Sequence, residues 1–81
     1  MNIGDKLIDK RPVRRQGSPV LRVRVVEAIS SNKEYVRLRT IKEYLPEGYV
    51  TGWYSPNVGR TTVSKVSTIN RQMKPYIEPV L

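Results

Sequence analysis

Two segments in which apolar and charged residues alternate constrain the fold of this chain more than any other feature. Residues 20–29, VLRVRVVEAI, and residues 35–41, YVRLRTI, both repeat with a period of two, which is the period of a β-strand with one buried face. Between them, residues 30–33, SSNK, have the composition of a turn. The sequence therefore predicts a β-hairpin.

The expected register of this hairpin follows from keeping its apolar side chains together. With an even number of loop residues, Val25 lies opposite Leu38 and Arg24 lies opposite Arg39, so the apolar faces of both strands coincide. A shift by one residue would place arginines in the core, where an unpaired charge is costly. The exposed face of the hairpin is then expected to carry four arginines: Arg22, Arg24, Arg37 and Arg39.

Further short strands are expected on both sides of the hairpin. Residues 6–15 predict a strand that Pro12 interrupts or confines to a sheet edge, because proline has no N–H for a ladder hydrogen bond. Residues 16–19, QGSP, predict a turn, and residues 49–54 predict a short strand after a loop rich in Tyr, Gly and Pro.

The segment 60–69, RTTVSKVSTI, leaves two structures open. Its Thr and Val content is typical of a strand. Val63, Val66 and Ile69 are nevertheless spaced by three, which fits a bulged strand or a short helix.

The length and strand pattern together predict the fold class. A chain of 81 residues supports one core, since a domain this small buries only about 60% of its unfolded surface. We expect a mainly β fold, either a small SH3-like barrel or a strongly bent antiparallel sheet of four to five strands, with a short C-terminal helix as an option. Residues 1–74 are expected to form this domain and residues 75–81 an extended C-terminal tail.

Two short motifs resemble SH3-like small barrels. Residues 3–7, IGDKL, are similar to the first strand of KOW-type and Tudor-type barrels, and residues 52–58, GWYSPNV, are similar to the segment before the last strand of SH3 domains. The Ser-Pro order departs from the usual Pro-Ser. Arg11, Arg14 and Arg15 also replace the acidic loop that SH3 domains use against basic proline-rich peptides. The resemblance therefore implies a barrel fold and does not imply binding of proline-rich peptides.

The charge balance predicts an anionic partner. The chain has 15 Lys and Arg against 7 Asp and Glu, a formal net charge of +8. Residues 1–40 hold ten of the basic residues and four of the acidic ones, so the positive charge is concentrated in the first half. Like charges facing each other across a sheet are destabilising unless an anion neutralises them, and guanidinium groups grip phosphate bidentately.

These features favour a small nucleic-acid-binding module that contacts mostly the phosphate backbone of DNA or RNA. Aromatic side chains interleaved with the arginines would stack on unpaired bases. The expected phosphate contacts are Arg11, Arg14, Arg15, Arg22, Arg24, Arg37 and Arg39, and the expected stacking or interface residues are Tyr35, Trp53 and Tyr54. A simpler interpretation is a solvated face neutralised by acids such as Glu27, Glu34 or Glu43, with Trp53 as the core anchor.

A protein partner is the alternative. A phage-type or accessory module could dock on an acidic surface of a larger enzyme or assembly and modulate it. The Tyr and Trp content of residues 44–54 and the apolar residues 76–81 support this hypothesis, because aromatic and Arg residues dominate interface hot spots. A structural component of a ribonucleoprotein or viral particle is a third hypothesis.

Catalysis is not expected. The chain has no histidine and no cysteine, which removes the commonest general base, the thiol nucleophile and the usual zinc ligands. Asp5 and Asp9 are the one candidate carboxylate pair, but their basic neighbours favour a turn acid and an ion pair. We expect no metal, no cofactor and no membrane segment. The expected location is the cytoplasm, or the host cytoplasm for a viral protein.

Overall fold

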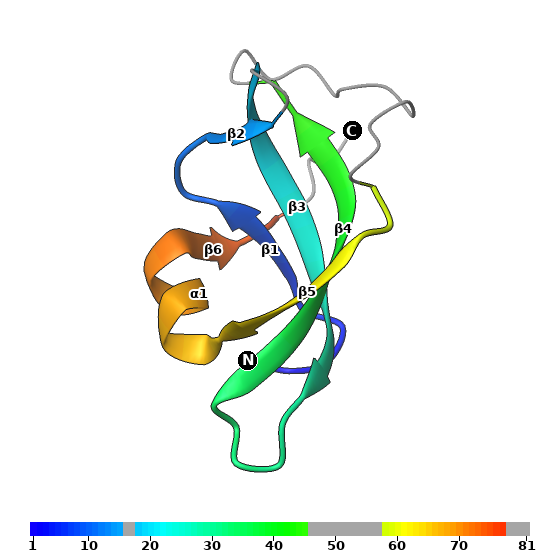
Figure 1. Ribbon diagram of the computed structural model, residues 1–81, viewed down its shortest axis with the longest axis vertical. Coiled ribbons are helices and arrows are strands. Elements are labelled where there is room, and N and C mark those ends of the chain that lie inside the picture. Colours follow the sequence, from blue (N-terminus) through cyan, green and yellow to red (C-terminus); the bar gives the residue numbers. More distant parts are fainter. Residues whose placement is uncertain (16–17, 46–57, 78–81) are drawn as a thin grey trace.

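The predicted hairpin is the centre of the fold. In the computed structural model, which describes residues 1–15, 18–45 and 58–77, strand β3 (Ser18–Ile29) pairs antiparallel with strand β4 (Tyr35–Tyr44) (Figure 1). In the turn between them the Asn32 side-chain oxygen accepts a hydrogen bond from the Glu34 backbone N–H at 3.0 Å. Lys33 adopts the left-handed conformation with φ of 61°. The turn predicted at residues 30–33 is therefore confirmed.

Shorter strands extend the hairpin on both sides. Strand β5 (Thr61–Lys65) pairs with β4, strand β1 (Lys6–Asp9) pairs with β3, and strand β6 (Met73–Pro75) pairs with β1. Strand β2 (Val13–Arg15) pairs with the start of β3. The resulting order is β5-β4-β3-β1-β6, and β2 lies outside this order beside β3. Over the described ranges these six antiparallel strands form an open sheet. The expectation of a strongly bent antiparallel sheet is confirmed, with one or two more strands than expected.

Two predicted segments are each divided into two elements in the structure. Pro12 lies between β1 and β2 and divides the predicted strand 6–15 into two, as its missing N–H led us to expect. Residues 60–69 hold both structures that the sequence left open, since β5 is followed directly by helix α1 (Val66–Gln72). Within the helix, Val66 and Ile69 share a face that packs toward the core.

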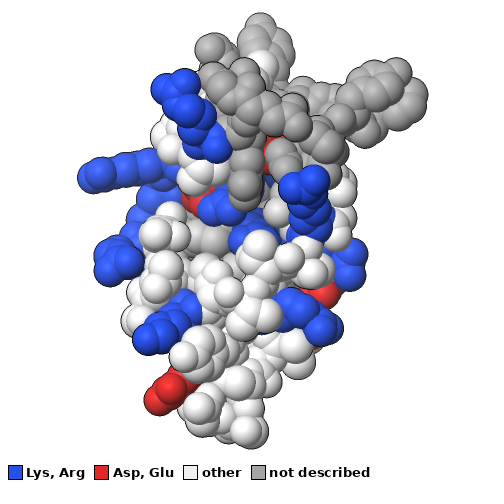
Figure 2. Space-filling view, viewed as in Figure 1, with Lys and Arg blue, Asp and Glu red and all other residues white. Residues whose placement is uncertain are grey.

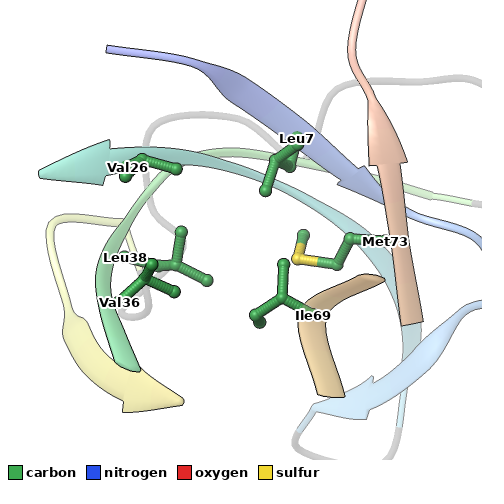
Figure 3. Close-up of a cluster of buried hydrophobic side chains, with 6 residues drawn as sticks. All are labelled: Leu7, Val26, Val36, Leu38, Ile69 and Met73. Carbon is green, nitrogen blue, oxygen red and sulfur yellow. The ribbon is translucent and has the colours of Figure 1, made fainter. Parts of the chain in front are cut away.

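The core fills the inner side of the curved sheet. Leu7, Val26, Val36, Leu38, Ile69 and Met73 form the cluster, and Figure 3 shows their side chains converging between the strands and the helix. Burying one such side chain contributes about 1.5–3 kcal/mol, so these few residues dominate the stability of so short a chain. The helix α1 and strand β6 close one side of this core (Figure 1).

The register between β3 and β4 differs from the expected one. Arg24 lies opposite Thr40 instead of Arg39, and Leu38 pairs with Val26. The pairing is irregular between Val23 and Arg24 and again between Val26 and Ala28, and each irregularity shifts the register between the two strands by one residue. Arg24 consequently lies on the same face of β3 as the core residue Val26. The prediction of four arginines on one exposed face is therefore wrong.

Other expectations fall partly outside the described residues. The predicted strand at 49–54 and almost all of the motif at 52–58 lie outside them. In the predicted turn 16–19, the first two residues also lie outside, whereas Ser18 and Pro19 belong to β3 and not to a turn, because they pair with β2. At the C-terminal side, Pro75 still belongs to β6, and the backbone N–H of Tyr76 donates to the carbonyl of Lys6 at 2.9 Å. The domain boundary at residue 75 stays a prediction.

In the parts of the chain that the structure describes, no helix combines the length and the apolar character needed to cross a membrane.

Candidate nucleic-acid interface

Arg22, the first arginine of the hairpin, is held inside the sheet by Asp9. Its backbone N–H and its Nε each donate to Asp9 Oδ2 at 2.8 Å, and its Nη2 donates to Oδ1 at 3.0 Å. The two side chains are only 13% and 2% exposed. A bidentate pair with a further backbone bond satisfies both charged groups. The guanidinium of Arg22 is therefore committed to Asp9 and does not face a ligand.

Arg24 is buried as well, with 3% of its surface exposed. Its Nη2 donates to the carbonyl of Leu38 at 3.1 Å and to Thr62 Oγ1 at 2.7 Å, so it links three strands across the inner face. Thr40 and Glu43 of β4 are buried on the same side of the sheet. The inner face thus has an apolar end with the core cluster and a polar end with these groups. Arg22 and Arg24 support the fold, and the expected phosphate-binding face loses half of its members.

Arg37 and Arg39 project from the outer face, as the alternation of β4 predicted. Both contact Glu27, which occupies the extra position of the irregularity between Val26 and Ala28. Arg39 Nε donates to Glu27 Oε1, and Arg37 Nε lies 3.3 Å from Oε2. The hydrogen bond from Arg39 lowers the pKa of the Glu27 carboxyl, so the acid stays ionised between the two cations. One carboxylate therefore offsets part of the charge of this pair.

The predicted stacking residues divide between described and undescribed parts of the chain. Tyr35 is 39% exposed at the start of β4 and shares the outward side of the strand with Arg37, as expected. Trp53 and Tyr54 lie outside the described residues. Of Arg15, only the backbone is described, which pairs with Ser18 of β3.

A recess with basic walls lies at a different place in the fold. It has a volume of about 640 Å³ between the β1–β2 connection and the end of α1. The two walls are joined by hydrogen bonds between residues distant in sequence. The Lys10 backbone N–H donates to the carbonyl of Gln72 at 2.9 Å, and Lys10 Nζ donates to the carbonyl of Asn70 at 3.1 Å. The lining residues are Asp9, Lys10, Arg11, Pro12, Val13, Arg71 and Gln72.

The described residues that line the recess carry more positive than negative charge. Lys10, Arg11 and Arg71 are exposed, whereas the lining acid Asp9 is 3% exposed and bonded to Arg22. Exposed Arg14 follows directly after the lining residue Val13. Figure 2 shows Lys and Arg side chains along the edge of the molecule that carries β2 and α1. We call the set Lys10, Arg11, Arg14 and Arg71 the basic edge.

The sequence identified only part of the basic edge. Arg11 and Arg14 were expected in a basic loop, and the structure places them at the recess and beside it. Lys10 and Arg71 were not expected as site residues. The chain positions joined by the Lys10–Asn70 hydrogen bond are 60 residues apart, so no local pattern brings them together.

Comparisons with family models, with curated proteins and with solved structures found no match to this chain. Among the described residues, no three His, Cys, Asp or Glu side chains come close enough together to hold a metal ion. The function is therefore argued from the geometry and charge of the described surface.

Proposed function

We propose that this protein is a small basic nucleic-acid-binding module that holds the phosphate backbone of DNA or RNA through its basic edge. The observation that carries the proposal is the meeting of Lys10, Arg11 and Arg71 around one recess. Among its described lining residues the one acid, Asp9, is buried and paired with Arg22. On this proposal the protein binds without catalysing a reaction, and it needs neither a metal nor a cofactor.

The chemistry of the basic edge supports phosphate as the bound group. Three of its four members are arginines, and a guanidinium presents a planar fork of donors that matches two phosphate oxygens. Contacts of this kind position a protein on the backbone and carry little sequence information. We therefore expect weak discrimination among base sequences and strong dependence on salt.

We also propose that the fold is related to SH3-like small barrels. The curved antiparallel sheet and the short strands support it, and the motif at residues 3–7 leads into β1 as the resemblance implies. Most of the second motif lies outside the described residues.

One observation favours a second candidate function, docking on an acidic surface of a protein partner. Tyr35, Arg37 and Val63 line a shallow pocket on the outer face of β4 and β5, and Val63 is 66% exposed. Tyr and Arg are enriched at interface hot spots, and the exposed Val63 adds apolar surface beside them. This surface is separate from the recess, because the two share no lining residue.

Fluorescence anisotropy tests the leading proposal. Single-stranded and duplex DNA and RNA oligomers are titrated with the protein at low and near-physiological salt. The variant Arg11→Gln/Arg71→Gln should bind at least about tenfold more weakly, since each lost phosphate contact removes charge-assisted hydrogen bonds. Arg37→Gln/Arg39→Gln is the matched control, because it removes the same formal charge from the outer face of the hairpin. A larger loss in the control would move the interface to the hairpin, and no binding by the unmodified protein at low salt would refute the proposal.

A further inference from the structure

We propose that the recess at the basic edge receives one nucleotide unit of a single strand, with its base against Pro12 and Val13 and its phosphate held by Arg11 and Arg71. The inference rests on the proposed function and adds to it a preference for unpaired over duplex nucleic acid. It also names the group that the recess would bind.

The size of the recess fits such a unit. Sites for small molecules and cofactors span about 300–1,000 Å³, and the recess has about 640 Å³. A surface that binds only phosphates has no need for a hollow of this volume, because a duplex keeps its bases stacked inside and presents its backbone outward. An unpaired nucleotide can turn its base into a hollow.

The lining of the recess is divided in the way a nucleotide requires. Pro12 and Val13 offer apolar surface against which a planar base can pack, while Arg11 and Arg71 supply the cations for its phosphate. The Gln72 amide has both donor and acceptor atoms, which suits the polar edge of a base.

Two negative groups at the recess, the Asp9 carboxylate and the Asn70 carbonyl, are already satisfied by cations. The carboxylate of Asp9 is bonded to Arg22. The last carbonyls of α1 carry the negative end of the helix dipole, and the Lys10 ammonium donates to the one on Asn70. An incoming phosphate therefore meets the guanidinium groups of Arg11 and Arg71, and the described lining residues present no exposed carboxylate beside them.

The walls of the recess are held in place without a ligand. Asp9 pairs with Met73 between β1 and β6, and Val13 pairs with Val20 between β2 and β3. The Lys10 backbone joins Gln72 between these two pairings. A preformed site loses little conformational entropy on binding, which favours capture of a single nucleotide.

Abasic oligomers separate this inference from the proposed function. A single-stranded oligothymidylate and an abasic oligomer of the same length carry the same phosphates, so they differ only in the bases. We expect the abasic strand to bind at least about fivefold more weakly than the oligothymidylate, because each stacked base adds to affinity. We also expect a duplex of equal length to bind more weakly than the single-stranded oligothymidylate. Equal affinity for all three would overturn the nucleotide site and leave phosphate binding intact.

A variant of the wall provides the second measurement. Val13→Ser removes apolar surface without changing charge, so it should weaken binding of the oligothymidylate and leave the abasic strand unaffected. In an NMR titration of the protein, thymidine monophosphate should shift the backbone resonances of residues 10–13 and 71–72 more than inorganic phosphate does. A uniform loss for both strands in Val13→Ser, or shifts elsewhere in the chain, would contradict the assignment. If none of the oligomers binds, the proposed function itself fails.

Discussion

The carboxylate of Asp9 accepts three hydrogen bonds from Arg22, including one from its backbone N–H, although the two residues are 13 positions apart. This pair joins β1 to β3 at the polar end of the inner face. It also removes the negative charge of Asp9 from the wall of the recess. One contact therefore serves both the fold and the electrostatics of the candidate site.

Removing one partner of this pair should be costly. Asp9→Ala leaves the Arg22 guanidinium buried without its carboxylate, and we expect a loss of about 3–5 kcal/mol in the free energy of unfolding. Urea denaturation followed by circular dichroism measures the change. Because a chain of this length has a total stability of only about 4–12 kcal/mol, Asp9→Asn provides a milder variant that keeps the shape of the side chain. A change below about 1 kcal/mol in both variants would show that the pair does not support the fold.

The position of Arg24 leads to a related prediction. Its Nη2 donates to Thr62 Oγ1 at 2.7 Å, and this bond links β3 to β5 across β4. Thr62→Val removes the acceptor while keeping the β-branched shape. We expect a loss of about 1–3 kcal/mol in the free energy of unfolding, because the buried, charged donor Arg24 loses a partner in this part-buried bond. Thr61→Val is the control, since the neighbouring residue lies on the same exposed strand. Equal effects of the two variants in thermal unfolding would contradict a specific role for the Arg24 bond.

The hairpin shows how far the sequence alone could predict this fold. The alternation of β4 was correct as far as Thr40, because Tyr35, Arg37 and Arg39 are exposed and the residues between them are buried. The alternation of β3 was correct in part, because Val23 is fully buried and Ile29 packs against the core. Arg22 and Arg24 were wrongly placed on an exposed face. The expected register treated a buried arginine as unpaired, but Arg22 has a partner in β1 and Arg24 has partners in β4 and β5. A local pattern does not contain that information.

The candidate site was predictable to a similar extent. The basic loop was evident from Arg11 and Arg14, because runs of cations are visible in the sequence. The recess could not be predicted from the sequence, because its other wall comes from Arg71 and Gln72. These residues lie at the end of a helix that the sequence left undecided. The spacing of Val66 and Ile69 was compatible with that helix, and the packing of both residues against the core decides it.

The turn of the hairpin contains a strained position that a substitution can relieve. Lys33 has φ of 61°, a conformation that side chains with a Cβ disfavour. Lys33→Gly should therefore stabilise the protein by up to about 1 kcal/mol, while Lys33→Ala should give no gain because alanine keeps the Cβ. Chemical denaturation of the two variants makes the comparison. Equal stability of the glycine and alanine variants would show that the left-handed conformation is not a source of strain.

The contacts of Glu27 predict a dependence of stability on pH. Hydrogen bonding to Arg39 lowers the pKa of Glu27 in the folded protein, so folding favours its ionised form. The resulting stabilisation is present above the unfolded pKa and is lost as pH falls through the lower folded pKa. The difference in stability between the unmodified protein and Glu27→Gln should therefore shrink as pH is lowered from 7 toward 3. A difference that stays constant over this range would show that the contacts with Arg37 and Arg39 do not depend on the charge of Glu27.

The basic edge predicts the salt dependence of nucleic-acid binding. Neutralising three or four phosphates of a single strand releases counterions, so the logarithm of the association constant should fall with the logarithm of salt concentration with a slope between about −2 and −3. Anisotropy titrations at several salt concentrations give this slope. In Arg11→Gln/Arg71→Gln it should become shallower by about 1.4, because each lost contact removes about 0.7, whereas Arg37→Gln/Arg39→Gln should keep it. A slope changed only by the hairpin variant would place the phosphate contacts on the outer face of β4, and a slope that neither variant changes would mean that the cations responsible lie elsewhere in the chain.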